Sequence, residues 1–145
     1  MSELNLPDNL DHLLIEQLPD AIVFSDIEGT IRRWNTAAER IFGFTSAEAV
    51  GANLDIIIPE RFRDAHWRGF ERAMNDKATK YVGRPMPTRS ARKDGTNIVV
   101  ELSFEIVVAG NEAIGALATA RDITERFEKE RADRKRLQEL ETARE

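Results

Sequence analysis

The sequence predicts an α+β fold in which an antiparallel sheet has one face covered by helices. The segment "NIVVELSFEIVV" alternates apolar and polar residues, which puts Ile98, Val100, Leu102, Phe104 and Ile106 on one face of a strand. The expected order of elements is two strands, several short helices, one longer helix and three further strands. Together, the alternation and this order indicate a sheet with helices packed on one side.

The first half of the chain is expected to hold a short helix, a β-hairpin and two more helices. "DNLDHLLIEQL" is amphipathic at helical spacing, with Asp8 as the expected cap. Ala21–Asn35 reads as a hairpin that turns through Gly29. Asn35 should cap the helix "TAAERIF", which ends at Gly43, and "TSAE" has the spacing of a capping box before the next helix.

The second half is expected to hold the longer helix and the remaining strands. "IIIPERF" leads into that helix, with Pro59 where a first helical turn tolerates proline. Pro85 and Pro87 interrupt the strand that follows, since neither can donate a ladder hydrogen bond. The segment Lys93–Gly95 and the pair at positions 110–111 are turn signals that separate the last strands.

The chain divides into three expected parts: a leader at 1–9, a domain at 10–124 and a C-terminal signalling helix or linker at 125–145. The last part is helix-forming and rich in charges of both signs, so it gains stability only by pairing with a copy of itself or with a neighbouring domain. A frayed tail is the alternative. Asp122 and Glu125 have capping-box spacing for this helix.

Composition excludes several classes of function. The formal net charge of the 145 residues is −5, which does not favour nucleic-acid binding. No apolar run is long enough to span a bilayer, so a cytoplasmic location is expected. The chain has no cysteine, which removes disulfides, thiolate metal sites and any cysteine-linked chromophore. No catalytic motif stands out, and we expect a chain that is not an enzyme.

His66 occupies an unusual place in the segment "ERFRDAHWRGFERAM". At helical period, Phe62, Gly69, Phe70, Ala73 and Met74 form one apolar arc, and His66 lies in the middle of it. Two interpretations remain open: a histidine satisfied inside a core, or a ligand that points into a cavity.

The stretch from about position 10 to 124 resembles a PAS (S-box) sensory domain. The resemblance rests on "LPDAIVFSDIEGTIRRWNTAAERIFGFTSAEAVGANL", "IIPERFRDAHWRGF", "RKDGT" and "ARDITER", in this order and at these intervals. It implies a five-stranded antiparallel sheet, a helical flank and a pocket between them. It also implies an input or dimerisation module ahead of an output domain such as a histidine kinase or a cyclase.

The longer helix is similar to that of haem-binding PAS domains in oxygen-sensing histidine kinases. The resemblance makes His66 the axial ligand of haem b and Arg72 the partner of a propionate. Arg84 and Arg89 lie on the strand that follows and could also reach the rim, and a solvated face is the alternative for these arginines. The expected cofactor residues are His66, Met86, Arg72, Phe62, Phe70, Leu102, Phe104 and Ala118, with His66 and Met86 on the metal. Ala116, Ala118 and Ala120 leave room along the last strand, either for a closely packed helix or for a planar ligand.

The likeness departs from those kinases on the distal side. Met86 stands where they carry an arginine, and a thioether cannot donate to bound oxygen. Haem would therefore be six-coordinate through His66 and Met86, or five-coordinate without an arginine donor. Met86 as a gap-filler is the plainer interpretation.

A PAS domain without cofactor is the alternative function: a dimerisation or protein-interaction module. The homodimer is expected to form through the helix that carries Leu10, Leu13 and Leu14, with Leu18 on the same side, and through the C-terminal helix. A ligand sensor predicts an interior cavity lined by His66, Phe104 and the alanine strand, whereas the module predicts a filled core. Partners of other classes, nucleic acid and membrane, are not expected.

Overall fold

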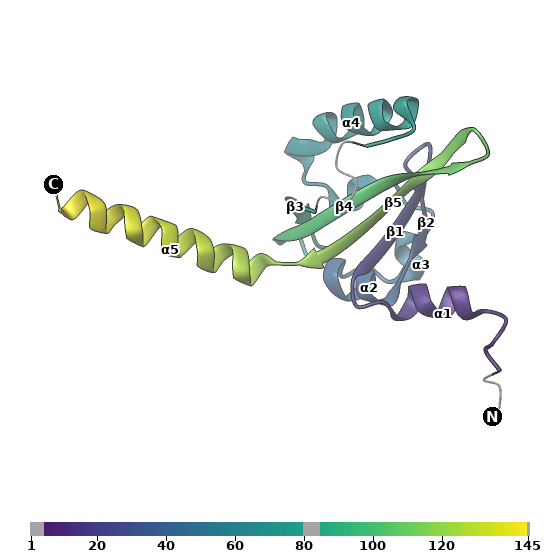
Figure 1. Cartoon of the computed structure of the whole chain (residues 1–145), viewed down its shortest axis with the longest axis horizontal. Coiled ribbons are helices and arrows are strands. Elements are labelled where there is room, and N and C mark those ends of the chain that lie inside the picture. The colour runs from purple at the N-terminus through teal and green to yellow at the C-terminus, as the bar shows by residue number, and fades with distance from the viewer. Residues whose placement is uncertain (1–4, 80–84, 145) are drawn as a thin grey trace.

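A computed structural model of the chain describes residues 5–79 and 85–144, and shows one five-stranded antiparallel sheet with helices around it (Figure 1). The order across the sheet is β2-β1-β5-β4-β3. The strands are β1 (Ala21–Asp26), β2 (Ile31–Trp34), β3 (Met86–Ala91), β4 (Asn97–Ala109) and β5 (Glu112–Asp122). The expected α+β fold with one antiparallel sheet is confirmed.

The helices follow the predicted order. They are α1 (Leu10–Gln17), α2 (Thr36–Phe42), α3 (Ser46–Ala49), the 3₁₀ turns η1 (Leu54–Ile57) and η2 (Glu60–Phe62), α4 (Arg63–Asp76) and α5 (Thr124–Ala143). In Figure 1, α4 lies across the sheet and α5 extends away from the rest of the molecule as a single helix. None of the helices among the described residues is long and apolar enough to cross a membrane.

Side-chain caps explain where the short helices begin. The Asn35 side chain accepts a hydrogen bond from the Ala38 N–H at the start of α2, and Gly43 ends that helix in the left-handed conformation at φ 84°. Thr45 and Glu48 form the predicted capping box of α3. These caps set the boundaries of α2 and α3 at the predicted places.

Two predicted caps are wrong. α1 begins after Asn9 and not after Asp8, and no side chain caps it. The Asp122 carboxylate accepts hydrogen bonds from the backbone N–H and the hydroxyl of Thr124, and α5 starts without the capping box expected from Asp122 and Glu125. A local turn at Asp122 takes the place of that box, because a carboxylate bonds readily to the N–H two residues on.

The core lies between the sheet and the helices. β4 pairs with β5 so that Leu102, Phe104 and Ile106 lie opposite Ala120, Ala118 and Ala116. The alternation of β4 therefore puts its apolar residues on the same face of the sheet as the three alanines. Pro87 is accommodated because β3 is an edge strand.

Candidate functional site

α4 positions His66 over the helix-covered face of the sheet. Phe70 and Ala73 of the same helix are buried in the core, at 8% and 6% exposure. The His66 ring packs against Trp67 with centroids 4.7 Å apart and against Phe70 at 5.9 Å. The imidazole thus lies among aromatic side chains and is only partly exposed.

The His66 imidazole is neutral and lacks a partner for one of its nitrogens. Its Nδ1 is buried and has no hydrogen bond within the part of the chain that the structure describes. Burial lowers the pKa of His66, and the negative charge of Asp55 opposes this shift more weakly. A neutral imidazole with an unused nitrogen has the form in which histidine binds a metal.

The lowered pKa of His66 predicts how the stability of the haem-free protein depends on pH. The unfolded chain takes up a proton at His66 below about pH 6.5, while the folded chain resists it. Stability should therefore fall as the pH is lowered through about 6.5, the pKa of a histidine in the unfolded chain, and His66→Gln should flatten this fall. Urea unfolding at each pH measures it, with His12→Gln as the comparison for loss of a histidine. An unchanged slope in His66→Gln would contradict a buried, neutral His66.

On the face of the sheet below α4, small residues of β5 lie opposite large residues of β4. Ala116 and Ala120 are buried, and Ala118, Leu102 and Phe104 pack against the core while keeping some exposure. All lie on the helix-covered face. The choice between a closely packed helix and a planar ligand over these alanines stays open.

Met86 belongs to the same face of the sheet but to its edge. It pairs with Leu102 at the start of β3, and its side chain is 47% exposed. The register therefore puts the thioether on the side of the sheet where α4 and His66 lie, with no cover of its own among the described residues.

The remaining residues expected at the site are scattered. Arg72 is exposed and follows His66 by six residues, which turns it roughly 240° around the helix axis. The Arg89 guanidinium lies over the Phe127 ring at 5.9 Å, and Phe62 is 38% exposed beneath Arg61. Arg84 lies outside the described residues. The apolar arc of the sequence thus holds for Phe70 and Ala73, but Phe62 and Gly69 do not join it.

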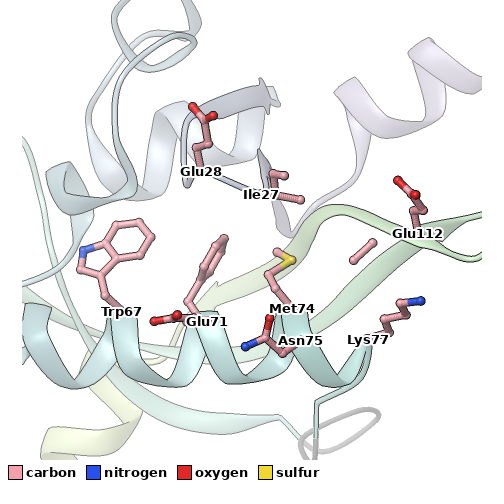
Figure 2. Close-up of a pocket in the computed structure, with 10 residues that line it drawn as sticks. Ile27, Glu28, Trp67, Glu71, Met74, Asn75, Lys77 and Glu112 are labelled. Carbon is pink, nitrogen blue, oxygen red and sulfur yellow. The ribbon is translucent and has the colours of Figure 1, made fainter.

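The structure has a cleft of about 620 Å³ beside the second half of α4, shown in Figure 2. Its walls come from α4, from the β1–β2 turn and from the start of β5. Trp67 and Phe70, the two ring neighbours of His66, line it. His66, Phe104 and Ala118 are not among its lining residues, which differs from the interior cavity expected of a ligand sensor.

Sequence analysis missed Trp67. Its indole N–H donates to the Asp55 carboxylate at 2.7 Å, and its ring lies against Gly29 in the β1–β2 turn. Trp67 therefore ties α4 to two other segments of the chain. In the sequence, only the presence of a tryptophan next to His66 draws attention to this position. Asp55 and Gly29 are distant from Trp67 in sequence, so no local pattern indicates these contacts.

Comparisons with known proteins agree with the fold. A family model for the PAS fold matches residues 9–123. The sensor protein FixL of Bradyrhizobium diazoefficiens is 32% identical over 129 residues, which cover 89% of this chain and 25% of FixL. The oxygen sensor protein DosP of Escherichia coli is 26% identical over 118 residues, which cover 81% of this chain and 15% of DosP.

Solved structures show the same fold. The PAS domain of a protein from Colwellia psychrerythraea superposes with a TM-score of 0.68 at 24% identity, covering 81% of this chain and 97% of that domain. The chain spans a quarter or less of the length of FixL and DosP. The likeness to those two sensors therefore concerns one domain of each.

Proposed function

Because the chain belongs to the PAS family and is a sensory domain related to FixL and DosP, we propose that it binds haem b through His66 and passes the state of the haem to α5. DosP is named as an oxygen sensor, which suggests a gas or redox signal for this chain. An output domain such as a histidine kinase or a cyclase would lie outside this chain. On this proposal the chain has no catalytic activity of its own.

The observation that carries the proposal is the buried Nδ1 of His66, which has no hydrogen bond to any of the residues described. A core histidine is normally satisfied by a partner, since an unpaired buried polar group costs roughly 1–3 kcal/mol. A ligand outside the chain would account for a buried imidazole whose pKa is lowered and whose Nδ1 has no partner among the described residues.

The residues of the chain fit haem in their chemistry. His66 would supply the axial nitrogen, and Met86 is the candidate for the second ligand, because its thioether faces the same side of the sheet. Phe70, Leu102, Phe104 and Ala118 would form the apolar walls, and Arg72 would pair with a propionate. A bound haem would supply an iron centre that responds to a diatomic gas or to an electron.

The route to α5 runs along β4. At the start of β4, the backbone N–H of Val99 donates to the Thr124 hydroxyl at 3.0 Å, and the Ile123 N–H donates to the Val99 carbonyl at 2.9 Å. Arg126 of α5 forms an ion pair with Glu101 at 3.1 Å. The strand that carries Phe104 is thus bonded to the first turn of α5, so that a shift of β4 would move that helix.

We propose a homodimer as the state in which α5 acts. Leu14 and Leu18 at the N-terminal helix are 57% and 42% exposed, and Leu137 and Leu140 on α5 are 60% and 56% exposed. Exposed leucines on two helices favour pairing with a second copy. Leu10 and Leu13 of α1 are only half-buried and belong to the same proposed contact.

A dimerisation module without cofactor is the second candidate. It is favoured by the cluster of buried residues beneath α4, which includes Phe70, Ala73, Ile106, Ala116 and Ala120. On this alternative the leucines would carry the function and His66 would be a structural residue.

The absorption spectrum of the protein from cells supplied with a haem precursor tests the proposal. We expect a strong Soret band in the wild type, its loss in His66→Ala, and its retention in His12→Ala, because His12 is exposed and contacts Arg33 instead of the core. If the wild type is colourless and stays colourless after addition of hemin, the haem proposal is wrong. The dimerisation module without cofactor then remains as the function.

Three further measurements make this experiment specific. Circular dichroism of His66→Ala shows whether the variant is folded, so that loss of colour is not confused with loss of structure. In Met86→Ala, a shifted band would identify Met86 as the second ligand, and an unchanged band would show that Met86 does not bind the iron. Sedimentation of the colourless and coloured forms measures whether the dimer depends on haem.

A further inference from the structure

The cleft lies beside the second half of α4, and His66 is not among its lining residues. In Figure 2, Trp67 and Met74 rise from α4 toward Ile27 and Glu28, while Lys77, which follows α4, lies on the same side as Glu112. The volume of about 620 Å³ would accommodate a small organic molecule.

The wall that α4 contributes is aromatic and held in place. Trp67 and Phe70 pack edge to face with centroids 5.1 Å apart, and Met74 follows on the same side of the helix. The bond from the Trp67 indole to Asp55 and the contact of its ring with Gly29 fix the indole in one orientation. A fixed indole is the best of the aromatic platforms for a cation, because its ring faces carry partial negative charge.

The charges of the cleft are predominantly negative. Glu28, Glu71 and Glu112 line it from three different elements, and all three are exposed. None of them forms an ion pair with another described residue. Lys77 is the one cation among the lining residues described, and its ammonium donates to the Asn111 carbonyl. Three carboxylates against one ammonium leave the lining with a net charge of −2.

We propose that this cleft binds a small organic cation, an amine or quaternary ammonium with an apolar body. The apolar body would lie against Trp67, Phe70 and Met74, and the positive group would be held by the rim carboxylates and the indole face. The site is separate from His66 and does not require haem. Occupancy would be felt by the β1–β2 turn and by the start of β5, since both form its walls.

Nuclear magnetic resonance of the haem-free chain tests this proposal with benzyltrimethylammonium as the probe. The two tryptophans give two indole N–H signals, assigned with Trp67→Phe. We expect the Trp67 signal to shift with a saturable, millimolar dependence on probe up to about 20 mM. The Trp34 indole, which donates to the Phe44 carbonyl in the core, should not shift.

Charge variants separate a specific site from general attraction to an acidic protein. The triple variant Glu28→Gln, Glu71→Gln, Glu112→Gln should bind the probe roughly tenfold more weakly, since each exposed pair adds a small amount. The matched triple Glu128→Gln, Glu130→Gln, Glu139→Gln on α5 changes the net charge equally and should bind within about twofold of the wild type.

Three results would overturn the proposal: no shift of the Trp67 signal, equal binding of benzyl alcohol or 3-phenylpropanoate, or equal weakening by both triple variants. Because binding is measured on haem-free protein and none of the charge variants replaces His66, failure of this experiment leaves the haem proposal unaffected. If the protein binds the ammonium probe but no haem, the proposal for the cleft holds and the haem proposal fails.

Discussion

Replacing Asn35 by alanine should lower the free energy of unfolding by about 3–5 kcal/mol. The Asn35 side chain is completely buried and forms four hydrogen bonds. Its oxygen accepts from the N–H groups of Ile22 and Ala38, and its nitrogen donates to the carbonyls of Ile15 and Asp20. The substitution removes the α2 cap and leaves buried groups of four other residues without a partner. Urea unfolding measures the change.

Asn53 provides the matched control. It also caps a helical turn, η1, but it is exposed. At this cap the Asn53 side chain accepts a hydrogen bond from the Asp55 N–H at 2.8 Å. Asn53→Ala should therefore cost about 1 kcal/mol. Equal losses in the two variants would show that Asn35 acts only as a cap and does not join α1, β1 and α2.

Gly29→Ala should destabilise the protein by about 2–4 kcal/mol, because two costs add. Gly29 has a φ of 84°, where a side chain is strained. A Cβ at this position would also lie 2.2 Å and 2.5 Å from two ring carbons of Trp67. The Trp67 ring cannot move away freely, since its indole is bonded to Asp55.

Gly95 isolates the contact with Trp67 from the backbone strain. Its φ is 87°, and a Cβ there would meet nothing within 4 Å, so Gly95→Ala should cost only about 1 kcal/mol. In a Trp67→Ala background, Gly29→Ala should cost no more than Gly95→Ala does. If the penalty of Gly29→Ala is the same with and without Trp67, the indole does not fix α4 to the β1–β2 turn.

The fold could be predicted from the sequence because its signals are local. The alternation of β4, the turn at Gly29 and the caps at Asn35 and Thr45 each act within a few residues, and the structure confirms all of them. The wrong caps of α1 and α5 were also local predictions. They failed because Asp8 and Asp122 have several possible backbone partners, and spacing alone does not choose among them.

The candidate site was predicted less completely because it depends on contacts between distant segments. The helical period placed His66 correctly on the sheet side of α4, but it also included Phe62, which lies before the helix in a separate 3₁₀ turn. The position of the cleft depends on the contacts of Trp67 with Asp55 and Gly29. It also depends on where the β1–β2 turn and the start of β5 lie, because these segments form its other walls. No spacing pattern in the sequence encodes such contacts.

The central claim is that His66 is the residue that holds the haem. The chain has two histidines, so His12→Ala leaves His66 as its only imidazole. Pulsed electron paramagnetic resonance of the ferric, haem-loaded variant, labelled with ¹⁵N-histidine, would detect a histidine nitrogen bonded to iron. We expect a ¹⁵N coupling to the iron in His12→Ala and none in His66→Ala. No coupling in His12→Ala, or a coupling that persists in His66→Ala, would contradict the claim.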